Sequence, residues 1–262
     1  MLGYTVQIYF DFSGYSDMAL GIALMLGINL PLNFNSPYKS TSVADYWRRW
    51  HMTLGRLLKE NLYIPLGGSR CPRSRQYLNL MIVLLLAGLW HGAGWNFVLW
   101  GAVHGVFLVV NHAFRTLLVP KVPALAKTRL PYIILTLLCI AIARVLFRTQ
   151  SMEGAGLMFK SLVGSFGVSV SDNLEGLLGG LAGIGLQFEG TGLLESDAIA
   201  WVVIGFMICF VCPNSNEIFG RQESNTRIKW KPNVAWAVYV ATLFVVSLLH
   251  LHRVSEFIYY RF

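Results

Sequence analysis

Residues 84–95 read Leu-Leu-Leu-Ala-Gly-Leu-Trp-His-Gly-Ala-Gly-Trp, which places one ionisable ring between two apolar segments of the kind that enter a bilayer. An imidazole in hydrocarbon is costly, so a chain that keeps one there usually uses it. The glycines at 88, 92 and 94 leave room beside His91, where the backbone can bend or another molecule can approach closely. The stretch therefore predicts a reactive centre inside a membrane.

The composition of the whole chain also indicates a membrane protein. Of the 262 residues, 55% are hydrophobic and 13% are charged, and that charged fraction is about half of what a soluble domain carries. The net charge of +8 lies in short connectors between apolar blocks, as the positive-inside rule describes, so lipid and not nucleic acid is the expected partner. The sequence predicts an all-α fold, a polytopic transmembrane helical bundle that forms a single membrane domain over residues 1–262.

Apolar blocks predict the transmembrane helices. They cover residues 15–30, 77–90, 95–118, 131–147, 198–212 and 234–251. These lengths are close to the roughly 20 residues that a spanning helix needs. Residues 43–64 alternate charge with aromatic bulk and predict one interfacial or re-entrant helix, with tryptophans at headgroup depth. Residues 161–197 are Gly-rich and acidic and predict a long loop with shallow helical pieces.

The basic connectors predict the orientation of the chain. Residues 70–75, 115–129 and 221–231 carry arginines and lysines, which places them on the cytoplasmic side. At about 1.5 Å per helical residue from Arg75, His91 lies roughly 20 Å into a bilayer whose hydrocarbon is about 30 Å thick. A reagent from either side would reach His91 only through a funnel.

Two histidines, His51 and His91, are the candidate catalytic residues. They are separated by 40 positions, lie on different elements, and directly follow Trp50 and Trp90. Such a pair could divide the work between general base and substrate positioning. From spacing alone, the plainer alternative is slightly favoured, in which each imidazole only hydrogen-bonds a backbone carbonyl in a helix bundle.

Other side chains are weaker candidates for contacting a substrate. Asp17 is expected at the entrance to the first helix, where it could brace a histidine or only hydrogen-bond neighbouring helices. Arg48 and Arg49 could bind anionic donor groups through their guanidinium planes, although membrane anchoring is the commoner use. Trp50 and Trp90 could hold a substrate beside the histidines. The one CxxC pair lies in an apolar block with no second pair and no nearby histidine, so no metal is expected.

Five motifs in a fixed order make the sequence recognisable. They are Tyr-Phe-Asp-Phe-Ser-Gly-Tyr-Ser-Asp-Met-Ala (9–19), Asn-Phe-Asn-Ser-Pro-Tyr (33–38), Trp-Arg-Arg-Trp-His-Met-Thr-Leu (47–54), Tyr-Ile-Pro-Leu-Gly-Gly-Ser-Arg (63–70) and Gly-Leu-Trp-His-Gly-Ala-Gly-Trp (88–95). The series resembles the membrane-bound O-acyltransferase (MBOAT) family, and within it the bacterial alginate O-acetyltransferase branch with its relatives that acetylate other polysaccharides or peptidoglycan. The closing segment 255–262 resembles the end of that branch. An ordered series is far more specific than any single histidine.

This resemblance implies an O-acyltransferase of the bacterial cytoplasmic (inner) membrane. It implies that His91, in the Trp-His-Gly motif, is the catalytic base and that His51 is the second functional histidine. An acetyl group would pass from a cytoplasmic thioester donor, acetyl-CoA, towards an extracytoplasmic polysaccharide or a partner acetyltransferase. No bound cofactor is implied beyond that donor substrate.

Two departures from the family pattern leave alternatives open. The match covers only the C-terminal part of a typical member, so the fold is expected to be N-terminally truncated. Residues 57–61, Leu-Leu-Lys-Glu-Asn, also replace a more aromatic family motif. A non-catalytic transport or scaffold subunit is the first alternative, and transfer of a different acyl group such as D-alanyl is the second.

Overall fold

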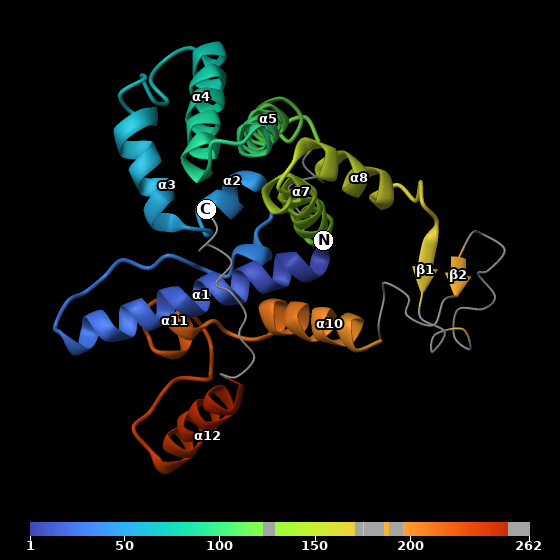
Figure 1. Cartoon of the computed structure of the whole chain (residues 1–262). Helices are drawn as coiled ribbons and strands as arrows, with labels where there is room; N and C mark the ends of the chain where they lie inside the picture. Colours follow the sequence, from blue (N-terminus) through green and yellow to red (C-terminus); the bar gives the residue numbers. More distant parts are fainter. Residues whose placement is uncertain (123–128, 171–174, 176–185, 189–195, 251–262) are drawn as a thin grey trace.

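The computed structural model describes residues 1–122, 129–170, 175, 186–188 and 196–250 (Figure 1). The longer helices are α1 (Leu2–Met25), α4 (Arg73–His91), α5 (Trp95–Leu117), α7 (Leu130–Arg148), α8 (Met152–Leu162), α10 (Ser196–Val211) and α12 (Val234–His250). The shorter helical segments are η1 (Pro37–Lys39), α2 (Val43–Trp47), α3 (Met52–Leu58), the π-helical turn η2 (Lys59–Tyr63) and α11 (Ser215–Ile218). The strands β1 (Val168–Val170) and β2 (Leu186–Phe188) pair in parallel.

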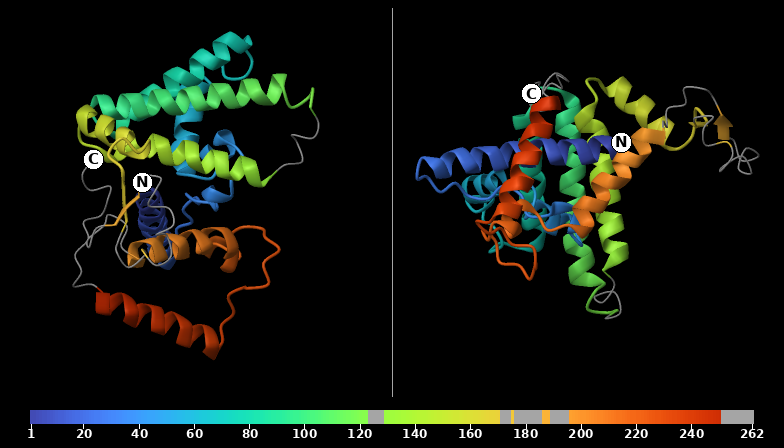
Figure 2. Two further views of the ribbon diagram at one scale, coloured as in Figure 1. Left: turned by 90° about the vertical axis from the view of Figure 1, so that its right-hand side faces the viewer. Right: turned by 90° about the horizontal axis from the view of Figure 1, so that it is seen from below.

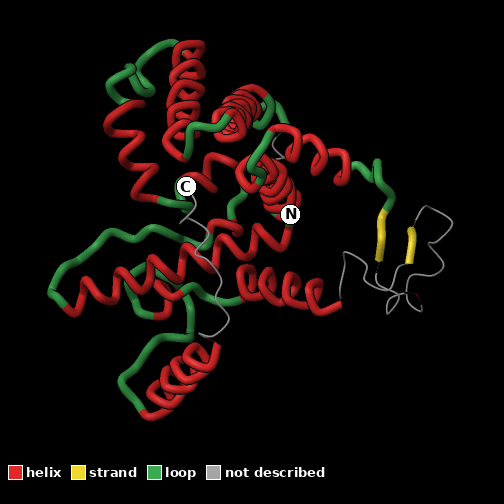
Figure 3. Tube along the Cα trace, viewed as in Figure 1, coloured by secondary structure: helices red, strands yellow, loops and turns green. Residues whose placement is uncertain are grey.

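The predicted all-α architecture is confirmed, because helices account for nearly all the regular structure described (Figure 3). The helices α4, α5, α7, α10 and α12 follow the predicted apolar blocks to within a few residues. Among the described residues, α5 and α7 are long and apolar enough to cross a membrane, and α10 and α12 contain shorter apolar helices. The membrane topology and the single domain over 1–262 stay predictions, and the closing segment 255–262 lies outside the described residues.

The predicted start of the first helix is wrong. Hydropathy places this helix at 15–30, whereas α1 begins at Leu2 and ends at Met25. Polar side chains weaken the apolar signal of its first half, but the segment contains no proline and continues without a break until Gly27, whose φ is 75°. Asp17 therefore lies inside α1 and not at its entrance.

The predicted single helix over 43–64 is also wrong. The structure forms α2, a turn, α3 and then the π-helical turn η2. The break falls at His51, whose φ of 45° lies in the left-handed region, and a residue in that conformation cannot continue a right-handed helix. The candidate histidine is therefore displayed by a turn and not by a helix face.

The helices α4 and α5 pack closely because two glycines meet at their interface. A Cβ atom added at Gly88 would overlap the backbone carbonyl of Phe97, and one added at Gly101 would overlap the backbone carbonyl of Leu84. Each helix thus brings its backbone against the other, an approach that only glycine permits. This contact fixes His91, at the end of α4, relative to α5.

One buried arginine ties α7 to α1 and to the segment before α3. The Arg144 guanidinium donates hydrogen bonds to the Thr5 carbonyl at 3.0 Å and to the hydroxyls of Tyr38 at 2.6 Å and Tyr46 at 2.9 Å. It also lies 4.7 Å from the centre of the Trp50 ring. Within the described residues no carboxylate pairs with it. These five residues are called the Arg144 cluster below.

The C-terminal helices contribute less to the core. α10 packs along α1, where Gly205 lets the Val6 side chain approach its backbone. α12 has no buried residue, and Figure 2 shows it at the edge of the molecule. The parts of the fold that position the histidines are therefore α1, α2 to α5 and α7.

Replacing Gly101 by Ala is expected to destabilise the protein by about 1–3 kcal/mol, because the added methyl group forces the α4 and α5 backbones apart. Thermal unfolding in detergent measures this as a lower midpoint. Gly21→Ala is the matched control, since a Cβ there meets nothing within 4 Å. Equal midpoints for the two variants would contradict the close packing.

Replacing Arg144 by Met is expected to cost about 3 kcal/mol or more, because each hydrogen bond from a charged group contributes about 1.5–3 kcal/mol. Arg148→Met is the control on the same helix: Arg148 is exposed, and such surface changes usually stay within about 0.5 kcal/mol. Chemical denaturation of the two variants separates them. A loss no larger for Arg144→Met than for Arg148→Met would show that the cluster does not form.

Candidate functional site

The turn that carries His51 is tied to the Pro- and Asn-rich segment after α1. The Met52 N–H donates to the Asn33 carbonyl at 2.9 Å, and the Asn35 N–H donates to the Arg49 carbonyl at 2.9 Å. These bonds run on either side of His51 and hold the two segments together. The left-handed conformation of His51 is therefore supported from outside its own helix.

Hydrogen bonds around Asn33 fix the tautomer of His51. The Asn33 Oδ1 accepts from both the N–H and the hydroxyl of Thr53, at 3.4 Å and 3.0 Å, so this atom is the amide oxygen and not the nitrogen. The Asn33 Nδ2 donates to Ser16 Oγ at 3.3 Å. Because the His51 Nδ1 lies 3.1 Å from Oδ1, Nδ1 carries the proton in the neutral ring. The lone pair is then on Nε2, which is the atom that can accept a proton or a hydrogen bond.

His51 lies outside the helices long enough to span a membrane, and beside its polar contacts its ring packs against an aromatic side chain. The edge of its ring meets the Phe12 ring with 4.9 Å between centroids. Burial lowers the pKa of His51 to about 4, because desolvation penalises the charged imidazolium. The ring is therefore neutral near pH 7.

His91 is the last residue of α4 and is buried, with 7% of its surface exposed. Three aromatic rings contact it edge to face, Trp90 at 4.9 Å, Trp100 at 5.2 Å and Phe147 at 5.1 Å between centroids. Such packing restricts the orientation of the imidazole and keeps water from its faces. The three rings therefore hold the ionisable imidazole of His91 within an apolar interior.

The expectation that glycines leave open space beside His91 is wrong. The backbone of α5 occupies the space beside Gly88, and the Phe97 ring occupies the space beside Gly92. These glycines allow close packing of the protein against itself. An approach to His91 therefore depends on side chains that move and not on gaps left by the glycines.

One set of aromatic rings, called the aromatic cluster below, contacts His91 and includes the residue before His51. Its members are Tyr46, Trp47, Trp50, Trp100 and Phe147. His91 contacts the cluster at Trp100 and Phe147, and His51 directly follows Trp50. The cluster encloses a cavity of about 20 Å³ that Arg144 and His104 also line, large enough for one water molecule. Within the described residues, neither His51 nor His91 lines that cavity.

The two predicted tryptophans have different surroundings. Trp50 is buried in the aromatic cluster under the Arg144 guanidinium. Trp90 is 64% exposed and meets His91 only along its ring edge. Trp50 therefore belongs to the packed interior, whereas Trp90 lies on the surface beside the imidazole, where a ligand could reach it.

The predicted charged residues do not gather around the histidines. Arg49 forms an ion pair with Asp45 at 3.0 Å and borders a separate cavity between α5 and α7. Arg48 is exposed. Asp17 accepts a hydrogen bond of 2.6 Å from Ser215 and lines a third cavity, of about 260 Å³, between α1 and the end of α10. Their roles in substrate binding stay predictions.

Sequence reasoning did not single out Arg144 or Asn33. A charged residue inside an apolar block is a functional or structural signal by itself, and Arg144 carries that signal within the block at 131–147. Asn33 offers no such signal, because its role depends on two chain segments meeting. His104 is buried and accepts a hydrogen bond from the Trp47 indole at 3.3 Å.

The sequence is similar to those of known membrane acyltransferases. The MBOAT, membrane-bound O-acyltransferase family, matches residues 1–150. A peptidoglycan O-acetyltransferase from Helicobacter pylori is 47% identical over 175 residues, which cover 64% of this chain and 32% of that protein. A probable alginate O-acetylase AlgI from Pseudomonas putida is 33% identical over 271 residues, covering 100% of this chain and 52% of the relative. A teichoic acid D-alanyltransferase from Streptococcus thermophilus is 33% identical over 121 residues, which cover 44% of this chain and 29% of that protein.

The chain spans about a third to a half of the length of these relatives. The family match contains the turn at His51 and all of α4, α5 and α7. Every residue of the Arg144 cluster and of the aromatic cluster lies within it.

The lowered pKa of His51 predicts a specific pH dependence of stability. The unfolded chain binds a proton near pH 6.5 whereas the folded chain does not until about pH 4, so stability is lost as the pH falls below 6.5. At pH 5 the loss from this group is about 2 kcal/mol relative to pH 7. Thermal unfolding of His51→Gln should therefore decline less with acid than the wild type. His250→Gln, at an exposed position, is the control, and parallel profiles for wild type and His51→Gln would contradict the burial.

Proposed function

Because the chain belongs to the membrane-bound O-acyltransferase family, we propose that it transfers an acetyl group from a thioester donor to a hydroxyl acceptor. The observation that supports this proposal is the surroundings of the two imidazoles: His91 packs against Trp100 and Phe147 of the aromatic cluster, and His51 packs against Phe12 and directly follows Trp50, another member of that cluster. The relatives named peptidoglycan O-acetyltransferase and alginate O-acetylase support acetyl as the transferred group.

In the proposed reaction His91 acts as the general base. Its neutral ring nitrogen takes the proton from the acceptor hydroxyl as that oxygen attacks the thioester carbonyl. The tetrahedral intermediate then collapses, the carbon–sulfur bond breaks, and the departing thiolate recovers the proton from His91. General base catalysis of this kind contributes about 10²- to 10⁴-fold. The aromatic rings around His91 would also exclude water that could hydrolyse the thioester.

His51 has the proposed role of a positioning residue. Asn33 holds its Nδ1 proton, so Nε2 is available to accept a hydrogen bond from a hydroxyl of the acceptor. The Thr53 and Ser16 contacts of Asn33 keep that amide from rotating. A pair of histidines on separate elements can in this way orient the acceptor with one ring and deprotonate it with the other.

We place this reaction in the bacterial inner membrane, with acetyl-CoA entering from the cytoplasm. The basic connectors next to α4, α5 and α7 are expected on the cytoplasmic side, and their positive charge supports entry of an anionic donor from that side. The proposed destination is an extracytoplasmic polysaccharide or a partner acetyltransferase that modifies it. The alternative function, a non-catalytic transport or scaffold subunit, differs from this proposal because it requires no chemistry at His91.

A second candidate is transfer of a D-alanyl group. The similarity to a teichoic acid D-alanyltransferase over 121 residues favours it. The two candidates share the base and the aromatic cluster, and they differ in the acyl group that the site accepts. Purified protein given acetyl and D-alanyl thioesters in parallel, with release of the free thiol as the readout, distinguishes them.

Replacing His91 by Ala is expected to reduce O-acetylation by at least about 10²-fold, because no other group then deprotonates the acceptor. The assay is the O-acetyl content of polysaccharide in cells whose acetylation depends on this protein, together with the amount of protein in the membrane. His250→Ala is the control, since this imidazole is exposed and bonds its own helix. Acetylation retained by His91→Ala at normal protein levels would contradict the assigned base.

A further inference from the structure

A groove of about 410 Å³ separates α3 and η2 from α4 and α5, and is called the η2 groove below. Figure 1 shows α3 and α4 beneath the loop that connects η2 to α4. The groove has the size of a small-molecule site. It shares no lining residue with the cavity between α5 and α7, so the two are separate sites.

The charges that line the η2 groove are mostly positive. Arg48, Arg56 and Lys59 line it, and all three are exposed. None of them forms an ion pair with a residue that the structure describes. Of the described lining residues, Glu60 alone carries a carboxylate. Because guanidinium and ammonium groups bind phosphate oxygens, the groove favours a ligand that carries an anionic phosphate.

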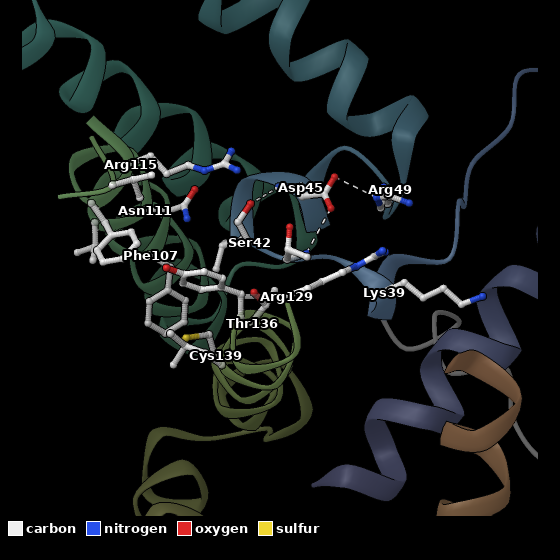
Figure 4. Close-up of a pocket in the computed structure, with 17 residues that line it drawn as sticks. Lys39, Ser42, Asp45, Arg49, Phe107, Asn111, Arg115, Arg129, Thr136 and Cys139 are labelled. Carbon is white, nitrogen blue, oxygen red and sulfur yellow. Dashed lines mark hydrogen bonds and ion pairs between the residues drawn. The ribbon is translucent and has the colours of Figure 1, made fainter. Parts of the chain in front are cut away.

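The adjacent residues Arg48 and Arg49 serve different surfaces. Figure 4 shows Arg49 joined to Asp45 at the cavity between α5 and α7, where the two groups are 3.0 Å apart. Arg48 lines the η2 groove instead. A phosphate in this groove therefore meets Arg48, whereas Arg49 already has its carboxylate partner.

The floor of the η2 groove is apolar and extends along α4. Leu80, Val83 and Leu84 line it from α4, and Leu108 lines it from α5. In the predicted orientation Arg75 lies at the cytoplasmic surface, and Leu84 is nine residues further along α4, roughly 13 Å deeper at about 1.5 Å per residue. The groove then extends from the headgroup region into the hydrocarbon. Such a shape suits a molecule that joins a phosphate to apolar chains.

We propose that the η2 groove binds an anionic phospholipid of the cytoplasmic leaflet. Its phosphate lies against Arg56 and Lys59, with Arg48 beside them, and its acyl chains lie along Leu80 and Leu108. Basic pockets between membrane helices on the cytoplasmic side bind anionic headgroups in this way. The lipid is not consumed, so this site is independent of the proposed acyl transfer.

The bound lipid would connect two parts of the fold. Lys59 and Glu60 begin the π-helical turn η2, and such turns are frequent at functional sites. The helix before it, α3, begins directly after His51. A lipid held between this segment and the pair α4 and α5 would stabilise the folded chain, because it binds the folded state and not the unfolded one.

The test is titration of the full chain in detergent with dihexanoyl phosphatidylglycerol, followed by thermal unfolding and by native mass spectrometry. The lipid should raise the unfolding midpoint and remain attached as added mass. Dihexanoyl phosphatidylcholine, whose headgroup has no net charge, should have a much smaller effect at the same concentrations. Equal effects of the two lipids would overturn the proposal.

A matched pair of double variants locates the binding site. Arg56→Ala/Lys59→Ala is expected to weaken phosphatidylglycerol binding about tenfold or more, since hydrogen bonds to charged groups are strong. Arg70→Ala/Arg73→Ala removes the same charge from the exposed basic loop, outside the groove, and should bind like the wild type. All four side chains are exposed, so neither variant should lose its fold. The same affinity in both would place the lipid elsewhere.

Glu60→Gln is expected to act in the opposite direction. Removing the one carboxylate among the described lining residues should tighten phosphatidylglycerol binding about two- to fivefold, as expected for an exposed charge. A weaker affinity in this variant would contradict the placement of the phosphate in the groove.

Two further arms identify the source of the phosphate. Glycerophosphoglycerol, the same headgroup without acyl chains, should bind far more weakly than the lipid, because it leaves the apolar floor uncovered. Inorganic phosphate and coenzyme A should not displace the bound lipid. Displacement by either, or equal binding of the bare headgroup, would make the groove a site for soluble phosphates and refute the lipid assignment.

Discussion

The positive charge of Arg144 in the interior constrains the rest of the structure. A buried guanidinium with no carboxylate among the described residues must be satisfied by neutral acceptors and by an aromatic face, and it finds them in Tyr38, Tyr46, the Thr5 carbonyl and Trp50. Those partners come from α1, from η1, and from α2 with the turn that follows it. Satisfying one charge therefore positions three separate parts of the chain.

The helix that carries Arg144, α7, also positions His91. Arg144 and Phe147 are three residues apart on α7 and so lie on neighbouring parts of its surface. Arg144 contacts Trp50, the residue before His51, and Phe147 contacts the His91 ring at 5.1 Å. One face of α7 thus sets the relative placement of both imidazoles. The glycine contact between α4 and α5 completes this arrangement by bringing Trp100 against His91.

The sequence predicted the features that depend on local pattern. Apolar blocks located α4, α5, α7, α10 and α12, because the length and hydropathy of a helix are properties of one segment. The start of α1 and the break at His51 were not predicted, since both depend on contacts made elsewhere. The break is held by backbone bonds to Asn33 and Asn35, and no periodicity within 43–64 reports a partner that lies before it.

The features of the candidate site also fall into those that local sequence could predict and those that depend on contacts between segments. The two histidines could be named from their residue type and motif context, whereas Arg144, the tautomer of His51 and the cavity at the α5–α7 seam arise only when segments meet. The space expected beside the glycines is filled by Phe97 and by the backbone of α5. A small residue in a sequence shows that something approaches closely, but not whether it is a ligand or another helix.

The most direct test of the central claim is an electron microscopy map of the full chain in lipid nanodiscs, at a resolution that shows side chains. The arrangement described above predicts the Arg144 guanidinium between the hydroxyls of Tyr38 and Tyr46, over the Trp50 ring, with Phe147 against His91. A map in which Arg144 instead faces lipid or the membrane surface, with Trp50 packed elsewhere, would contradict it.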